Sequence, residues 1–470
     1  MPDLKGTQGT FTIYTSNNRK ASKRIGGIQV SVSLEGNKIK TYIPGPNNNL
    51  SKDNEELRIP LEITLSGNEI VVLKIAKEKF MLKKRTYSKW IKLSFRCGPA
   101  MKICGICRFF VKQIHPKFEM YMTPIHIDPE KPSLPISFPL SYSIYLAKMN
   151  GSYATLGLAE DTWALNERVI DEDVFLDQAY QNHQEREKMF FDALDKTREG
   201  LCVCVFDTTD RIQHMFMRFM SENHPALDNG VDREKYRDVI EKLYMRMDSL
   251  IGQVMEKIKE KDVLIVLSDH GFKLFSRGVN LNTWLYKNGY LTLRNRRKTG
   301  REWFQDIDWK KTKAYTFGLS GIYINQTGRE SKGIVLPEDK EGLKKELIKK
   351  LQGLIDEGKK ETAIKKVYNS TECFDGPYRE NGPDLIIGYN EGYRASWGAA
   401  LGKVEEEVFA DNKKSWSGDH CMDPQIVPGV FYCNKKIISD KPHIIDMAPT
   451  ILDLFGIEPP SYMNGKSLIN

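Results

Sequence analysis

The sequence predicts an α/β fold, in which a mostly parallel sheet is covered by helices on both faces and a β-rich module precedes it. Short β-rich runs separated by turns fill residues 1–123, and a proline-rich connector follows at 124–140. Over residues 141–470, long amphipathic helices alternate with short apolar strands. This alternation is typical of strands that run parallel beneath helices.

The first module is predicted to be all-β. Its runs are rich in β-branched and aromatic residues, and Asn, Gly and Pro clusters separate them. The strands expected are Thr10 to Thr15, Ile28 to Leu34, Lys38 to Ile43, Leu61 to Leu65, Ile70 to Ile75 and Trp90 to Phe95.

In the second part, apolar residues recur at helical spacing from Tyr236 to Val254, which predicts an amphipathic helix. Three apolar runs are predicted to be buried strands of the parallel sheet: Leu201 to Phe206, Val263 to Leu267 and Asp384 to Gly388. Ligands of such sheets bind beyond the carboxyl ends of the strands, so we expect the chemistry there.

Composition narrows the class of protein. The chain has 40% hydrophobic and 28% charged residues, and a formal charge of +8 that is spread along its length. Because no basic tract concentrates this charge, we expect no nucleic acid polymer as partner, although a basic rim would suit a small anionic substrate. No apolar run approaches the roughly 20 residues of a membrane span, so we expect a cytoplasmic protein, with a signal in a longer form left open.

Acidic and histidine side chains follow two of the predicted strands. Asp210 and His214 are four residues apart, which places them on one face of the helix expected there. Asp269 and His270 follow the next strand, and His420 lies in a polar loop. Aspartate with histidine suits zinc or manganese. Each motif alone has a simpler interpretation, such as a helix cap or a turn, and the combination is what favours a metal site.

These motifs resemble those of the alkaline phosphatase superfamily, in particular the type I phosphodiesterase/nucleotide pyrophosphatase phosphohydrolases, which are related to cofactor-independent phosphoglycerate mutases. The resemblance covers nearly the whole chain. The segments that carry it are Thr209 to His214, Ser268 to Phe272, Arg277 to Asn282, Gly382 to Asp384, Ser415 to His420 and Ile445 to Thr450.

The resemblance implies a metal-dependent phosphoric ester hydrolase with an alkaline-phosphatase-like sheet and a β-rich cap. One divalent cation would be bound by Asp210, His214 and His420, and a second by Asp269 and His270. Zinc or manganese is expected, and magnesium is an alternative. The substrate would be a small phosphate mono- or diester.

Two aspartates and two arginines near these motifs are further candidate site residues. Asp207 and Asp419 would orient histidine ligands or bind metal themselves, and Asp207 competes with Asp210 for the ligand role. Arg211 and Arg277 are candidate contacts to phosphate oxygens, although surface arginines are an equally good interpretation.

The Ser or Thr nucleophile of such enzymes, and the strand ending in Asp-Gly before it, are not found in this sequence. A truncated or split gene, a wrongly chosen start codon and a separately encoded amino-terminal segment are the explanations we consider. Two further hypotheses remain beside the hydrolase: an inactive metal-binding or scaffold protein, and a phosphomutase.

Overall fold

The computed structural model describes residues 1–17, 26–99 and 101–469. The chain divides into two compact units, Met1–Ile212 and Gln213–Asn470. Each unit mixes strands and helices, so the α/β class is confirmed at that level. The domain boundaries placed at residues 123 and 140 stay predictions. No helix in the described ranges is long and apolar enough to cross a membrane.

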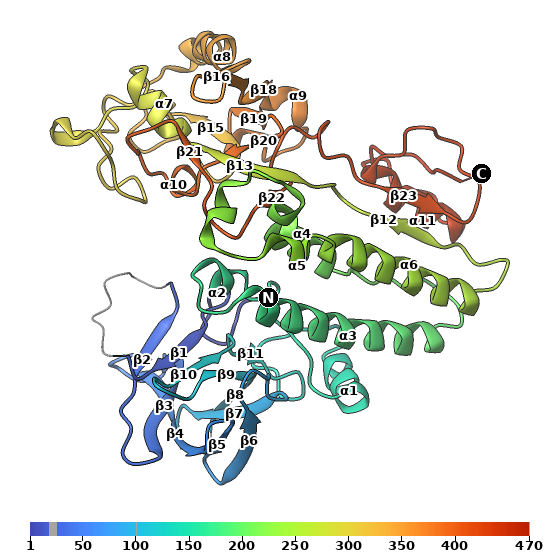
Figure 1. Cartoon of the computed structure of the whole chain (residues 1–470). Helices are drawn as coiled ribbons and strands as arrows, with labels where there is room; N and C mark the ends of the chain where they lie inside the picture. The colour runs from blue at the N-terminus through green and yellow to red at the C-terminus, as the bar shows by residue number, and fades with distance from the viewer. Residues whose placement is uncertain (18–25, 100, 470) are drawn as a thin grey trace. The chain divides into compact units, whose positions relative to one another are not determined.

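The N-terminal unit begins with β structure (Figure 1). One sheet has the order β2-β1-β10-β9, a second β11-β8-β7, and a third is the antiparallel meander β3-β4-β5-β6. The strands are β1 (Thr12–Thr15), β2 (Ile28–Ser31), β3 (Lys38–Asn47), β4 (Glu56–Ser66), β5 (Ile70–Ile75), β6 (Glu78–Lys83), β7 (Ile91–Arg96), β8 (Lys102–Cys107), β9 (Phe109–Gln113), β10 (Glu119–Met122) and β11 (His126–Ile127).

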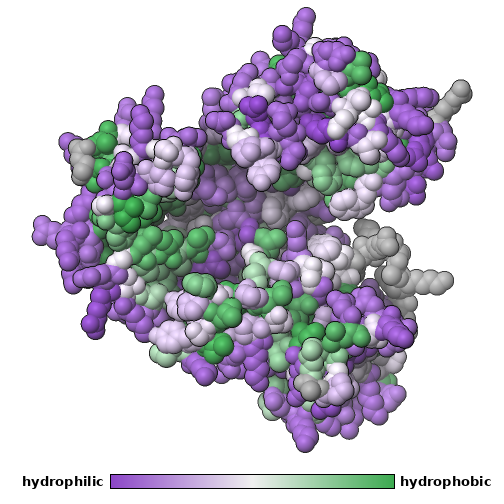
Figure 2. Space-filling view, turned by 180° about the vertical axis from the view of Figure 1, so that it is seen from behind, coloured by the Kyte–Doolittle hydropathy of each residue, from purple (hydrophilic) through white to green (hydrophobic). Residues whose placement is uncertain are grey.

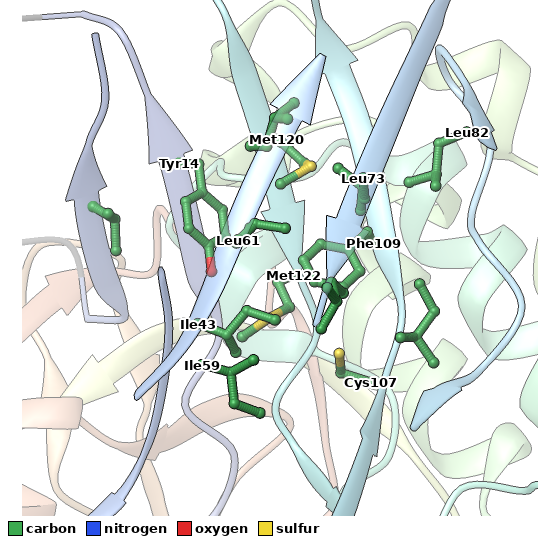
Figure 3. Close-up of a cluster of buried hydrophobic side chains, with 14 of the residues drawn as sticks. Tyr14, Ile43, Ile59, Leu61, Leu73, Leu82, Cys107, Phe109, Met120 and Met122 are labelled. Carbon is green, nitrogen blue, oxygen red and sulfur yellow. The ribbon is translucent and has the colours of Figure 1, made fainter. Parts of the chain in front are cut away.

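One hydrophobic core joins these sheets (Figure 3). In β4, Ile59, Leu61 and Ile63 are buried while the residues between them are more exposed, as the period of two of a half-buried strand requires. Phe109 and Met120 from the neighbouring sheet contribute to the same cluster. The burial therefore follows from the alternating sequence pattern.

Helices complete the N-terminal unit: α1 (Ser141–Asn150), α2 (Thr162–Asn166) and α3 (Glu172–Lys196). The carboxylate of Asp171 accepts a hydrogen bond from the backbone N–H of Val174 at 3.1 Å, which caps the start of α3. Gly151, with φ of 88°, ends α1 in a conformation that favours glycine. Helices α1 and α3 pack against each other (Figure 1).

The segment Leu201 to Phe206 departs from the prediction. Its side chains alternate between exposed and half-buried, as in an extended chain, but no strand in the described ranges pairs with it, and it is not a buried strand. Leu201, Val203 and Val205 are 56%, 70% and 67% exposed, whereas the ring of Phe206 packs against Phe190. One face of the segment therefore covers α3, and the other presents apolar side chains to solvent.

The C-terminal unit contains a four-stranded antiparallel sheet of order β14-β15-β19-β18 and a second sheet in which β13 pairs with β20, β21 and β22. Its elements are η1 (Met217–Met220), η2 (Pro225–Asn229), α5 (Arg233–Tyr236), α6 (Val239–Lys257), β12 (Ile265–Leu267), β13 (Lys273–Val279), α7 (Leu281–Lys287), η3 (Arg294–Arg296), β14 (Ala314–Phe317), β15 (Gly321–Ile324), α8 (Pro337–Leu351), β16 (Ile355–Asp356), β17 (Glu361–Thr362), β18 (Ile364–Asn369), α9 (Ser370–Cys373), η4 (Arg379–Asn381), β19 (Leu385–Tyr389), β20 (Gly392–Ala395), α10 (Trp397–Ala400), β21 (Phe409–Asp411), β22 (Gly418–Asp419), β23 (Phe431–Cys433), η5 (Ile444–Asp446) and α11 (Met447–Leu454).

The mostly parallel, alkaline-phosphatase-like sheet expected from the sequence is not found among the described residues, whose strands pair mostly antiparallel. Strand β12, expected inside a parallel sheet, pairs antiparallel with β23 instead. Strand β19 joins antiparallel neighbours on both sides. The parallel pairs between named strands are β1 with β2 and β13 with β20. Alternation of helices and strands gives the order of elements, but these pairings depend on distant segments that alternation does not specify.

Exposed apolar side chains on the segment Leu201 to Phe206 generate a prediction about solubility. Figure 2 shows hydrophobic residues gathered in patches on the face that it draws. Unpaired, apolar extended segments are templates for pairing between chains. We expect the double variant Val203→Lys, Val205→Lys to aggregate less than the parent in light-scattering measurements on heating.

The matched control is Tyr378→Lys, which also replaces an exposed apolar side chain, 79% exposed, but lies outside this segment. It should leave aggregation nearly unchanged. Equal aggregation of the parent and the double variant would contradict the role assigned to the extended segment.

The buried histidine of β11 makes the N-terminal unit sensitive to acid. Nδ1 of His126 accepts hydrogen bonds from the backbone N–H groups of Thr155 and Leu156, at 3.0 and 3.2 Å, which requires the neutral ring. Burial, with the nearby charge of Arg108, lowers the pKa of His126 to about 3. Between this pKa and the unfolded value of about 6.5, the unfolded chain binds a proton that the folded chain does not.

The free energy of unfolding should therefore fall as pH decreases below 6.5. Relative to neutral pH, His126 alone should lower it by about 2 kcal/mol at pH 5. His126→Asn keeps an acceptor oxygen but does not titrate, so its thermal midpoint should depend less on pH between 7 and 5. If both proteins lose the same stability over this interval, the imidazole is not the acid-sensitive group.

Candidate metal centre

Helix α4 (Thr208–Phe216) carries two of the predicted ligands. Asp210 lies in its first turn, where a carboxylate interacts favourably with the helix dipole. His214 follows one turn later. The division between the two units falls within α4, so Asp210 and His214 are fixed relative to each other by one continuous helix. The helical spacing expected from the sequence is thus present.

His214 is almost fully buried and is oriented by its surroundings. Its Nδ1–H donates a hydrogen bond to the carbonyl oxygen of Gly418 at 2.7 Å, and the ring of Trp416 lies over it with centroids 3.7 Å apart. Because a carbonyl can only accept, the bond places the proton on Nδ1 and leaves the lone pair on Nε2. This is the arrangement that prepares a histidine to bind a metal.

The loop that carries His420 is held by Asp419, which is 1% exposed. The Asp419 carboxylate forms an ion pair with Arg394 at 2.6 Å and accepts hydrogen bonds from the Trp416 indole at 2.8 Å and from the backbone N–H groups of His420 and Cys421. Burial alone would raise the pKa of Asp419, but these partners and the nearby His214 hold it at about 2. Asp419 therefore remains ionised and fixes the backbone of His420.

Three candidate ligands come together at this point. Ligand atoms of Asp210, His214 and His420 lie within 4.8 Å of one another. Two ligand atoms bound tetrahedrally to one zinc ion, each at about 2.1 Å, would be roughly 3.4 Å apart, so the three side chains would have to close by about 1 Å around the ion. One carboxylate and two imidazoles form a donor set that suits zinc or manganese. The residues present therefore fit a divalent cation.

The second predicted pair, Asp269 and His270, follows β12 after one intervening residue, Ser268. Strand β13 starts at Lys273 and pairs with β22 in the register Lys273 with Asp419, which brings the preceding His270 next to His420. The two imidazole rings stack with centroids 3.5 Å apart at 11°. The pair thus lies beside the first group of ligands.

The second metal site predicted at this pair stays a prediction. The Asp269 carboxylate is 80% exposed and lies 3.6 Å from Nε2 of His270. Within the described part of the chain, neither residue belongs to a group of three candidate ligands. Among the described residues, Asp269 and His270 therefore lack a third candidate ligand.

Asp419 and Cys421 form a second group of candidate ligands with His420. These three residues are consecutive, and the Asp419 carboxylate is already occupied by Arg394, Trp416 and two backbone N–H groups. Asp419 is thus placed to orient the loop, while the ligand role stays the less favoured alternative. Cys421 was not considered from the sequence, because a lone cysteine after an Asp-His pair carries no spacing signal.

The remaining predicted residues are engaged in ion pairs. Asp207 accepts a hydrogen bond from Arg186 at 2.8 Å and is in no three-ligand group of the described residues. Arg211 contacts the carboxylate of Asp210 and lies 3.9 Å from Glu160. Their roles as an orienting group and a phosphate contact stay predictions.

Arg277, the other candidate phosphate contact, is bound on two sides. It forms ion pairs with Asp356 at 2.7 Å and with Asp411 at 2.8 Å. These hydrogen bonds to Asp356 are the largest cause of the raised pKa of Arg277. Through these ion pairs, Arg277 links β13 to β16 and β21. Its role as a contact to phosphate oxygens stays a prediction.

Sequence reasoning missed the residues that support the ligands. Trp416, Gly418 and Arg394 contact ligands or Asp419, but none carries metal-binding chemistry of its own. One signal was present in the Ser-Gly-Asp-His motif: a Cβ at Gly418 would lie 2.4 Å from the carbonyl oxygen of Gln213. Glycine is therefore required where the loop passes α4.

Comparison with known families identifies the family of the chain. The profile of the type I phosphodiesterase/nucleotide pyrophosphatase family matches residues 137–416, more than half of the chain. The chain belongs to this family. No curated protein and no solved structure gives a significant match.

The proteins of this family are phosphodiester and pyrophosphate hydrolases, and they generally depend on metal. The matched region of the phosphodiesterase family contains Asp210, His214, Asp269 and His270. His420 lies four residues beyond it, so the geometry, rather than the match, places this histidine at the site.

The site geometry predicts the effect of removing one ligand. His214→Ala should weaken the binding of zinc or manganese by at least roughly 100-fold, since loss of mere supporting contacts already costs 10–100-fold. Isothermal titration of the purified chain with each metal measures this. His115→Ala, which removes an exposed histidine elsewhere, is the control and should bind metal as the parent does. Equal affinity of the His214 variant would remove this residue from the ligand set.

Proposed function

We propose that the chain is a metal-dependent phosphohydrolase that cleaves small phosphate mono- or diesters at a two-metal site. The observation that carries the proposal is the convergence of Asp210, His214 and His420 within 4.8 Å in a member of a phosphodiesterase family. Two divalent cations, zinc or manganese in the first place, would supply Lewis acidity toward the phosphoryl and leaving oxygens.

The residues of this chain would bind and orient the reacting groups. The bond of His214 Nδ1 to the carbonyl of Gly418 leaves Nε2 as the nitrogen that would bind a metal, and the ionised Asp419 holds the loop of His420. Asp269 and His270 would provide the beginning of the second site. Arg211, which touches Asp210, would balance negative charge that gathers there when a phosphate ester binds.

We further propose that the Ser or Thr nucleophile, with the remaining ligand of the second site, comes from a polypeptide segment outside these 470 residues. The extended run Leu201 to Phe206 supports this, because its backbone has no paired strand in the described ranges and Val203 and Val205 are exposed. A strand added along this run would cover those side chains and end near Asp207, at the start of α4.

The alternatives are an inactive metal-binding or scaffold protein and a phosphomutase. The incomplete pair of Asp269 and His270 is what favours the inactive alternative. The mutase alternative rests only on the resemblance of the sequence motifs to phosphoglycerate mutases, and no contact among the described residues favours it over hydrolysis.

Hydrolysis of p-nitrophenyl phosphate and of bis-p-nitrophenyl phosphate tests the proposal directly. With manganese or zinc, the purified chain alone should bind metal but turn over neither ester, because the nucleophile is missing. Metal-dependent turnover that is lost in His270→Ala and retained in His115→Ala would contradict the missing nucleophile while supporting the hydrolase. Absence of metal binding would overturn the site itself.

A further inference from the structure

A polar cavity of about 320 Å³ lies within the N-terminal unit, and none of its lining residues is a candidate metal ligand. The turn between β8 and β9, the end of α1 with the residues after it, and one face of α3 surround it. Its volume is at the lower end of the roughly 300–1,000 Å³ found for small-molecule sites. The cavity is therefore large enough for a small metabolite.

The base of this cavity is rigid. Arg108 is 6% exposed, donates to the side-chain oxygen of Gln181 at 2.6 Å and to Glu185, and lies over the ring of Trp90 at 4.3 Å. Glu185 also accepts hydrogen bonds from the Trp90 indole at 2.7 Å and from the backbone N–H of Ala154 at 2.9 Å. Such a network holds the cavity open in one shape, which lowers the ordering cost of binding a ligand.

The charge of the lining favours an anion. Glu185 compensates Arg108, whereas Lys188 lies one turn further along α3, is exposed, and makes no salt bridge to any residue in the described ranges. A lysine ammonium group is a common partner of phosphate groups. Gln184, which is also exposed, adds a neutral donor and acceptor on the same face of the helix.

Asn150, the last residue of α1, provides the second observation. Its side-chain nitrogen and oxygen are both shielded from solvent, and neither has a hydrogen-bond partner within the part of the chain that the structure describes. Unsatisfied buried polar groups are rare because each costs free energy. An amide can satisfy both groups at once on an edge that offers one donor beside one acceptor, as adenine does.

We propose that this cavity binds a nucleoside monophosphate, in which Lys188 meets the phosphate group and Asn150 turns toward the donor and acceptor edge of the base. A small monoester with one anionic group and one base matches Lys188, the one cation of the described lining without a salt bridge, and Asn150, the one buried amide of that lining without a partner. A sugar phosphate would match Lys188 but leave Asn150 unsatisfied.

The experiment is equilibrium binding of adenosine monophosphate to the full chain carrying His214→Ala, in excess EDTA, so that binding at the metal centre is removed. Adenosine and inorganic phosphate are measured beside it. We expect saturable binding of one adenosine monophosphate per chain, weaker binding of adenosine, and competition by phosphate only at high concentration.

Variants of exposed lining residues assign the contacts without disturbing the fold. Lys188→Ala should weaken binding of adenosine monophosphate at least about tenfold, the scale of a hydrogen bond to a charged group, and leave adenosine unchanged. Lys196→Ala, on the same helix but outside the lining, is the matched control. Asn150→Leu should weaken both ligands.

Several outcomes would overturn the proposal. The first is the absence of saturable binding, and the second is equal affinity of the Lys188 and Lys196 variants for adenosine monophosphate. The third is inorganic phosphate that binds as tightly as the nucleotide, which would mean an anion site without base recognition. None of them bears on hydrolysis at the metal centre, because the binding is measured without metal and in a variant that lacks one ligand.

Discussion

The bond between the imidazole of His214 and the carbonyl of Gly418 is the constraint on which the candidate metal centre depends. It joins residues 204 positions apart in the chain, and the backbone N–H of Ser417 returns a hydrogen bond to the carbonyl of His214 at 2.7 Å. Together these bonds attach the loop of His420 to α4. They also decide which ring nitrogen of His214 faces the other ligands.

A buried ion pair supports the same loop. Asp419 and Arg394 are 1% and 2% exposed, and each would carry an uncompensated charge without the other. Breaking such a pair by removing one partner typically costs about 3–5 kcal/mol. The pairing of β13 with β22 then places His270 against His420. The loop is therefore fixed before any ligand binds, as a preorganised site requires.

Local patterns in the sequence predicted what depends on local structure. The alternation in β4 and β5 and the helical spacing that defines α6 correspond to elements of the described structure. The spacing of Asp210 and His214 placed them on one helix face, and the Asp-His pair was found one residue after the end of β12.

Contacts between distant segments were not predictable in the same way. The register of β13 with β22, the antiparallel partner of β12 and the half-exposed run Leu201 to Phe206 all depend on which segments meet in space. Metal-binding chemistry can be recognised in aspartate and histidine, but not in the carbonyl of Gly418 that orients one of them.

X-ray absorption spectroscopy of the chain loaded with one equivalent of zinc tests the central claim most directly. The account predicts two imidazoles and one carboxylate around the metal. In His214→Ala, the number of imidazole ligands should fall from two to one. A spectrum without imidazole ligands, or one that His214→Ala leaves unchanged, would contradict it.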